Sequence, residues 1–296
     1  MLIETDRSML PELNIYASLN EPQLKRYHEP APGLFIAETA NVIERALRAG
    51  YRPVSMLIDR RLSGGPAEEV LRLAYAAVPE DELPVYLADL DVISSISGFQ
   101  QTRGMLAAMR RRPLPALSDI LEGASRIAVL ENVENPTNVG AVFRSAAAIG
   151  FDAVVLTRRS ADPLYRRAAR VSMGTVFQIP WTFVGGKRKA AGEDASQEGS
   201  GAYEEYYGDS LDTLRDAGFR LAAMALDERA VPVDDPGLKA AEKLALLFGN
   251  EEEGLLERTL DACDHIVKIP MMNGVDSLNV AAASAVAFWE LRKRKD

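Results

Sequence analysis

The sequence predicts an α/β protein of two domains, with a parallel β-sheet in the second. Three observations favour this class. Short apolar segments alternate along the chain with longer amphipathic ones, as strands alternate with helices in α/β folds. The 296 residues are enough for two domains, each with its own core. Polar turns follow three of the apolar segments, and open α/β sheets bind ligands at the ends of their strands.

The first domain is predicted over residues 1–112, with 1–20 as a weakly ordered or helical lead-in. A β-α-β unit follows, and Gly50 is expected to end its helix. In order, the expected elements are a strand at 33–38, a helix at 41–47, a strand at 53–58, a helix at 68–77, a strand at 84–87, a short helix at 89–95 and an apolar segment within 98–109. An arginine run at 110–112 leads into a predicted linker at 113–120.

The second domain is predicted over residues 121–296. Its strands are expected near 127–131, 153–156, 219–226, 244–248 and 265–269, with helices between them, which indicates a parallel sheet. The segment 185–208 is rich in glycine and charge and lacks apolar periodicity, so it is interpreted as a mobile surface insertion.

The first polar turn spans residues 131–140 and opens a helix that is expected to run to about Ile149. The apolar stripe of this helix consists of Val139, Val142, Phe143 and Ala146. Arg144 lies on the opposite face beside the small residues Gly140 and Ala141, which leaves room for a bulky group to approach the guanidinium. The alternatives are a solvated surface arginine and, for Asn138, a simple helix N-cap.

The second and third turns have the same form. A strand ends in Gly249, which permits close backbone approach or a positive φ. The carboxylates of 251–253 follow, although such a run also suits a solvated turn or a first helical turn. The strand at 266–269 stops at Pro270, and Ser277 and Asn279 then stand at the start of an alanine-rich helix, where they could also act only as caps.

Together the three turns resemble the motifs of the SpoU (TrmH-like) branch of the SPOUT RNA methyltransferases. The order is Asn-x-Gly-x-x-x-Arg, then Phe-Gly-Asn-Glu-x-x-Gly-Leu, then Ile-Pro-Met followed by Ser-Leu-Asn-Val. The resemblance covers about residues 121–296 and includes the segment 161–174. It implies a deep trefoil knot, an S-adenosylmethionine pocket formed by the three turns, and a homodimer that completes the active site.

The resemblance also implies roles for individual residues. The expected catalytic residues are Asn138, Arg144, Glu251, Ser277 and Asn279, and the expected cofactor-binding residues are Gly249, Asn250, Ile269, Met271 and Leu278. The implied reaction is attack of a ribose 2′-hydroxyl on the sulfonium methyl group, which depends on alignment. Because a guanidinium stays protonated, Arg144 is expected to activate the hydroxyl and hold a phosphate, not to remove the proton. The sequence departs from the family pattern at two places. Asn250 and Glu252 flank Glu251 where the family commonly has a small residue and a glycine, and Asp276 stands before Ser277 where glutamate is usual.

The N-terminal domain resembles the ribosomal-protein-like substrate-binding domain that precedes many SpoU catalytic domains. A net charge of −9 gives no global field that attracts RNA, so local basic groups must do so. Arg166, Arg167 and Arg170 are expected to contact RNA, whereas the basic tail 292–295 suits a solvated helix end. Ribosomal RNA is favoured over transfer RNA by family analogy.

Composition narrows the remaining choices. No apolar run reaches membrane-spanning length, and the polar, acidic residues 1–20 do not support a signal peptide. The single cysteine, Cys263, suits a reducing cytoplasm and a core or near-core position. Two histidines and one cysteine predict no metal site. Three rival functions remain: a non-catalytic ribosome-associated RNA-binding factor, a methylase of base nitrogens and a small-molecule methyltransferase. The nucleotide, and any role in antibiotic resistance, are open.

Overall fold

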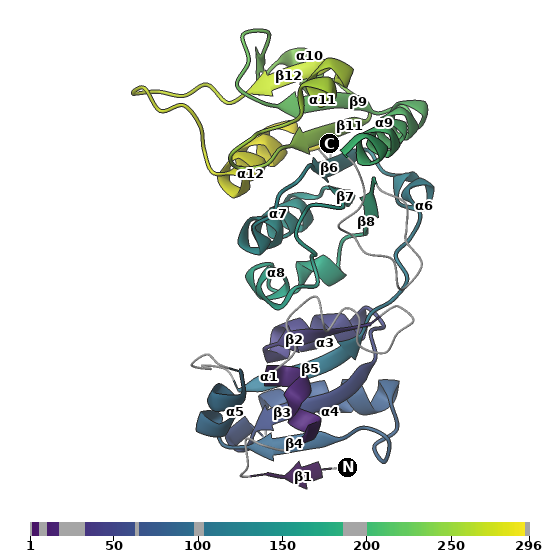
Figure 1. The fold of residues 1–296 in the computed structure, drawn as a ribbon, viewed down its shortest axis with the longest axis vertical. Coiled ribbons are helices and arrows are strands. Elements are labelled where there is room, and N and C mark those ends of the chain that lie inside the picture. The colour runs from purple at the N-terminus through teal and green to yellow at the C-terminus, as the bar shows by residue number, and fades with distance from the viewer. Residues whose placement is uncertain are drawn as a thin grey trace. The chain divides into compact units, whose positions relative to one another are not determined.

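The computed structural model describes residues 2–5, 11–17, 33–62, 65–97, 104–185 and 200–293 (Figure 1). The chain divides into two units. The first contains residues 1–113 together with 164–178, and the second contains 114–163 together with 179–296.

The first unit is built on a mixed sheet with strand order β1-β4-β3-β5-β2. Its strands are β1 (Leu2–Glu4), β2 (Leu34–Glu38), β3 (Pro53–Asp59), β4 (Val85–Ala88) and β5 (Met105–Arg110). Only β5 runs against its neighbours, and it separates the two strands of the predicted β-α-β unit by pairing with both β2 and β3. The lead-in differs from its prediction at residues 2–4, because β1 pairs with β4.

Helices cover both faces of this sheet. The helices are α1 (Asn14–Ala17), α3 (Ala40–Arg48), α4 (Pro66–Ala77) and α5 (Leu90–Ser97), with short 3-10 turns η1 (Pro11–Leu13) and η2 (Arg60–Leu62). Leu34 and Ile36 face α1 and α5, and the alternate residues of β2, Phe35 and Ala37, are buried on the other side with α3. The expected helices and strands of this domain are therefore confirmed.

Residues 164–178 pack with the first unit, although the sequence assigned them to the second domain. They form α8 (Arg166–Val171) and η3 (Thr175–Phe177). The physical reason is a set of specific contacts with β2 and α3. The buried Glu38 carboxylate accepts a hydrogen bond from Arg166 Nε at 2.8 Å, and the Phe177 ring lies 5.7 Å from that of Phe35. Arg45 Nη1 donates to the Met173 carbonyl at 2.7 Å.

The second unit has a sheet of parallel strands in the order β10-β12-β9-β11-β6-β7-β8. Its strands are β6 (Arg126–Leu130), β7 (Ala153–Thr157), β8 (Trp181–Val184), β9 (Arg220–Met224), β10 (Val231–Pro232), β11 (Leu244–Phe248) and β12 (His265–Lys268). The predicted parallel sheet is confirmed. The sequence missed β8 and β10, which are short edge strands.

Two further predictions for this unit need correction. The predicted linker 113–120 enters a helix, α6 (Leu117–Leu121), because Ile120 and Leu121 are buried in the core. The predicted insertion 185–208 overlaps α9 (Ser200–Asp216) from residue 200 onward, and residues 186–199 lie outside the described part of the chain.

The remaining helices form layers on the two faces of the sheet. They are α7 (Pro136–Ile149), α10 (Pro236–Lys239), α11 (Glu257–Ala262) and α12 (Val280–Leu291). Figure 1 shows α7 and α12 side by side on one face, and the cluster that contains α6 and α9 packs on the other. Among the described helices, none has the length and apolar character needed to cross a membrane.

A buried arginine ties the last helix to the start of the sheet. Arg126 is 3% exposed, and its guanidinium donates to the carbonyls of Leu291 at 2.7 Å, Ala241 at 2.8 Å and Glu242 at 3.0 Å. Burial lowers the pKa of this guanidinium, which the nearby Asp152 partly opposes. The C-terminal end of α12 is thereby fixed at the end of the sheet where the parallel strands β6 and β11 begin.

Candidate functional site

The C-terminal ends of β9, β11 and β12 converge with the start of α12 around one cavity of about 620 Å³ in the second unit. Four segments, at 224–226, 248–255, 267–271 and 277–283, line it together with Leu260. The strands β12, β9 and β11 are direct neighbours in the sheet, which explains why segments far apart in the sequence meet here.

The structure brings most of the predicted site residues to this cavity. Its lining includes all five residues expected to bind the cofactor, namely Gly249, Asn250, Ile269, Met271 and Leu278. It also includes Glu251, Ser277 and Asn279 of the expected catalytic set. Asn138 reaches the same place from α7 through hydrogen bonds, whereas Arg144 is not part of the lining.

Gly249 makes the second turn possible because there is no space for a Cβ atom at this position. A Cβ atom at this position would lie 2.2 Å from the carbonyl carbon of Gly254 and 2.4 Å from its oxygen. The turn closes on itself through a bridge in which the Asn250 and Gly254 amides each donate to the other's carbonyl at 3.0 Å. The expected close backbone approach at Gly249 is thus seen directly.

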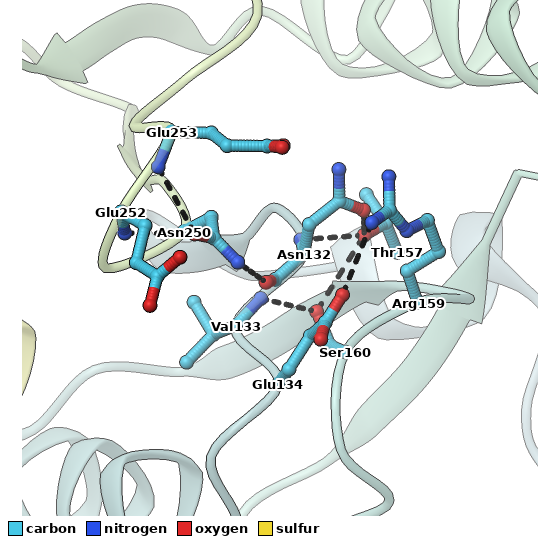
Figure 2. A network of polar contacts seen from close by, with 9 residues as sticks. All are labelled: Asn132, Val133, Glu134, Thr157, Arg159, Ser160, Asn250, Glu252 and Glu253. Atoms are coloured by element: carbon cyan, nitrogen blue, oxygen red, sulfur yellow. Dashed lines mark hydrogen bonds and ion pairs between the residues drawn. The ribbon is translucent and has the colours of Figure 1, made fainter.

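Asn250 fixes this turn and joins it to the first one (Figure 2). Its Oδ1 accepts hydrogen bonds from the backbone amides of Glu252 at 2.8 Å and Glu253 at 3.1 Å. Its Nδ2 donates to the carbonyl of Asn132 at 2.9 Å. The carboxylates of Glu252 and Glu253 are left exposed at the mouth of the cavity.

Residues at and just after the end of β7 hold the first turn in place (Figure 2). Asn132 has a left-handed φ of 56°, and Thr157 stabilises it by accepting from its amide and donating to its Oδ1, both at 2.9 Å. Ser160 Oγ accepts from the amide of Val133 at 3.1 Å. These buried hydroxyls give the turn a defined shape that backbone propensity alone would not give it.

Three catalytic candidates form a chain of hydrogen bonds across the site. Asn138 Nδ2 donates to Glu251 Oε1 at 2.5 Å, and Asn279 Nδ2 donates to Asn138 Oδ1 at 3.3 Å. Asn138 is only 6% exposed. One buried amide therefore aligns a carboxylate from the second turn and an amide from the third.

The capping alternatives resolve differently for the two asparagines. Asn138 is not the N-cap of α7: Pro136 stands at the first helical position, so the cap is Asn135, whose Oδ1 accepts from the Thr137 amide at 2.9 Å. Asn279 does cap α12, since its Oδ1 accepts from the Ala281 amide at 2.9 Å while its Nδ2 makes the bond to Asn138.

Arg144 and Ser277 are both exposed. Arg144 stands on the outer face of α7, about two turns beyond Asn138. It makes no ion pair with any residue that the structure describes, so its guanidinium is available to a ligand. Ser277 borders the cavity just before α12.

Sequence reasoning missed Glu131 as a functional residue. This carboxylate has no exposed surface, and it accepts hydrogen bonds from the Leu256 amide at 2.7 Å and from Thr259 Oγ1 at 2.8 Å. It thereby connects the end of β6 to the segment that leaves the second turn. An acidic residue directly after an apolar strand was the available signal.

The segment after β9 was also missed. Leu226 is 61% exposed at the border of the cavity, and the next residues are held by a local ion pair. Arg229 donates to both carboxylate oxygens of Asp227, at 2.9 and 2.8 Å, and this hydrogen bonding lowers the pKa of Asp227 to about 2. Nothing in the sequence marks this segment as part of a site.

The three arginines expected to contact RNA lie on α8 in the first unit, in different environments. Arg166 is 17% exposed and binds Glu38, whereas Arg170 is half exposed and lies 3.3 Å from the same carboxylate. Arg167 is exposed. Part of this basic group is therefore already neutralised within the protein, and its contact with RNA stays a prediction.

The fold and the ordered turns define the class of protein. A sequence model of the SpoU rRNA Methylase family matches residues 125–203 and 187–289, and the chain belongs to this family of RNA methyltransferases. The resemblance seen in the three motifs is confirmed.

Individual relatives extend the match over both units. An uncharacterised tRNA/rRNA methyltransferase of Mycobacterium bovis is 38% identical over 282 residues, or 95% of this chain and 88% of the relative. The 23S rRNA (guanosine-2'-O-)-methyltransferase RlmB of a Burkholderia species is 30% identical over 212 residues, or 70% of this chain and 76% of the relative.

Solved structures share the fold. An AdoMet-bound rRNA methyltransferase from Sinorhizobium meliloti has a TM-score of 0.76 and 23% identity, and the match covers 98% of this chain and 97% of that one. A structure described as an RNA 2'-O ribose methyltransferase has a TM-score of 0.69 and 25% identity, with 98% of each chain covered.

Proposed function

We propose that the protein transfers a methyl group from S-adenosylmethionine to a ribose 2′-hydroxyl of RNA, with ribosomal RNA favoured over transfer RNA. The observation that carries this proposal is the chain Asn279–Asn138–Glu251, because it joins all three turns beside one cavity. The relative RlmB, described as a 23S guanosine-2'-O-methyltransferase, supports both the reaction and the substrate class.

The cavity suits a bent nucleoside donor. Backbone groups at Gly249, Ile269 and Leu278 would hold the adenine and ribose, because glycine permits close approach and the Ile-Pro-Met segment supplies an apolar wall. Asn250 and Met271 would complete the wall. The buried hydroxyl and amide network behind the turn keeps this shape before the donor arrives, which lowers the cost of binding.

The acceptor side is assigned to the polar residues. Arg144 would hold the phosphate next to the target ribose, and Asn138, Glu251, Ser277 and Asn279 would orient the nucleotide. The 2′-oxygen forms a bond to the methyl carbon while the carbon–sulfur bond breaks, so the donor leaves as a neutral thioether. The hydroxyl proton passes to a phosphate oxygen or to water. Alignment of oxygen, carbon and sulfur supplies much of the acceleration.

A homodimer is part of this proposal. Large apolar side chains are exposed on the third turn and on α12: Met272 by 78%, Val275 by 53%, Val286 by 43% and Trp289 by 59%. Exposed large apolar side chains are a feature of protein–protein interfaces, and here they support a contact with a second copy of the chain. The trefoil knot, the cytoplasmic location and the independence from metal belong to the same proposal.

The decisive experiment has two readouts. Calorimetry of the pure protein with S-adenosylmethionine should show one site per chain. Mass spectrometry of digested RNA, from cells with and without the gene, should show a 2′-O-methylated nucleoside that disappears with the gene. A methylated base nitrogen would favour the base-methylase alternative, and donor binding without any methylated product would favour the non-catalytic factor. A modified transfer RNA would change only the substrate.

The role of Arg144 has its own test. Arg144→Lys keeps the charge but loses the planar fork, so turnover should fall while donor affinity is unchanged. Near-normal turnover of this variant would remove the need for a guanidinium.

A further inference from the structure

Two arginines of the first unit lie opposite one another on neighbouring strands. β3 and β5 pair in a register that places Pro53 against Met109, and the Arg110 amide donates to the Arg52 carbonyl at 2.9 Å just beyond it. Side chains directly opposite across an antiparallel pair have Cβ atoms about 5 Å apart. Arg52 and Arg110, which we call the arginine pair, are therefore close neighbours at the end of the sheet.

Among the described residues, no carboxylate forms an ion pair with the arginine pair. Both side chains are exposed, and neither makes an ion pair or side-chain hydrogen bond with any residue that the structure describes. Like charges placed directly opposite one another destabilise a sheet. Elsewhere in this unit arginines are matched to acids: Arg48 and Arg72 share Glu69 at 3.1 and 2.7 Å, and Arg166 binds Glu38.

A third arginine extends the positive charge. Arg112 donates to the Ala49 carbonyl at 2.6 Å and lies 5.7 Å over the ring of Tyr51, so it is held beside the C-terminal end of α3. The Tyr51 ring makes edge-to-face contacts with Phe35 and Phe177, with ring centroids 5.4 and 5.2 Å apart. The helix end explains Arg112, because cations are favoured there, but it does not explain Arg52 and Arg110.

We propose that the arginine pair, flanked by Arg112, is a binding site for RNA backbone phosphate. The inference rests on the proposed function, and it adds a site outside the arginines of α8. A phosphate group between two guanidiniums relieves their repulsion and accepts several charge-assisted hydrogen bonds. The register of β2 against β5 also separates the two basic regions, because Leu34 pairs with Arg110 at one end and Glu38 pairs with Leu106 at the other.

The test compares two double variants of the full chain that remove the same charge. R52A/R110A removes the arginine pair, and R48A/R72A removes two exposed arginines that already neutralise Glu69. Binding of a short RNA stem-loop is measured over a series of salt concentrations. R52A/R110A should lose about tenfold in affinity at low salt, and its log–log salt dependence should be shallower by about two. R48A/R72A should change much less.

Further readouts separate this site from catalysis. Turnover of R52A/R110A at saturating RNA and its affinity for S-adenosylmethionine should match those of the unaltered protein. Equal losses in the two variants would show a general field effect and overturn the inference, as would unchanged binding by R52A/R110A or no RNA binding by the unaltered protein. The proposed function fails by a different result, which is RNA binding without 2′-O-methylation by the unaltered protein.

Discussion

At the scale of single residues, Gly249 shows how tightly the candidate site is built. Its Cα hydrogen faces the backbone of Gly254, and the two strands of the turn cannot separate without breaking the bridge between Asn250 and Gly254. At Gly249 the wall of the cavity is therefore backbone, and this close approach to Gly254 is possible only because residue 249 has no Cβ atom.

We expect Gly249→Ala to abolish donor binding. A Cβ at 2.2 Å from a carbonyl carbon forces the turn apart, and overpacking of this kind costs about 1–3 kcal/mol of stability. Calorimetry with S-adenosylmethionine and a thermal melt check both effects. Gly208→Ala is the matched control, because a Cβ there meets no atom within 4 Å and the position is helical. Normal donor affinity in Gly249→Ala would contradict the assignment of the wall.

Cys263 is expected to resist thiol reagents at neutral pH. Burial, with a contribution from Asp264, raises the pKa of this thiol to about 12, and the side chain packs against the core as the sequence predicted. Because the folded pKa lies above the ordinary value of 9.0, the stability contributed by the protonated thiol is present below pH 9.0 and is lost as the pH rises toward about 12.

The reaction of Cys263 with a disulfide reagent, followed by absorbance, measures this. Labelling should be slow in the folded protein and fast in denaturant. An added cysteine in C263S/L114C, at a position 37% exposed, should react quickly in the folded state and serves as the control. Rapid labelling of folded Cys263 near pH 7 would show that the thiol is accessible as thiolate.

At the scale of elements, α12 is held at both ends. Asn279 joins its start to α7 through Asn138, and Arg126 binds the carbonyl of Leu291 at its end. Because both of its ends are bonded in this way, α12 holds the third turn at a fixed position relative to the sheet.

Arg126→Met should lower the free energy of unfolding by about 3 kcal/mol or more, because the buried carbonyls of Leu291, Ala241 and Glu242 lose their donor. Arg220→Met is the control: Arg220 and Arg126 both pair with Leu244, from opposite sides of β11, but Arg220 is exposed. Denaturant titration of both variants measures the difference. Equal stability of the two variants would mean that the hydrogen bonds of Arg126 to these carbonyls contribute nothing to the free energy of unfolding.

Much of the element pattern could be predicted because apolar periodicity and glycine stops are local signals. That Gly249 and the Ile-Pro-Met segment border one cavity could be predicted as well, since they follow the ends of neighbouring parallel strands. Glu131 could not, because its partners Leu256 and Thr259 are more than a hundred residues away and no local pattern marks them. Asn138 was open to a capping role because only the structure shows that Pro136 starts the helix.

At the scale of the whole molecule, the first unit is not continuous in sequence. Residues 164–178 complete it by covering Glu38 and Phe35, although strands of the second unit precede and follow them. No sequence signal predicted this assignment, because ion pairing between Glu38 and Arg166 depends on the tertiary fold alone.

A fragment of residues 1–113 should consequently be less stable than the same fragment carrying 164–178 on a flexible linker. Loss of Arg166 removes its 2.8 Å ion pair with the buried Glu38 carboxylate, which costs about 3 kcal/mol. Thermal melts followed by circular dichroism compare the two. As a control, the extended fragment with R166M should resemble the short one. Identical melting of all three would show that 164–178 adds no stability.

The split of the first unit also governs how the protein is made. A ribosome synthesises β6, α7 and β7 before it reaches residue 164, so Arg166 is added to the chain only after three elements of the second unit. Most chains finish one domain before starting the next. In this chain the first unit cannot be completed until residues 164–178 have been synthesised, when the second unit is already partly synthesised.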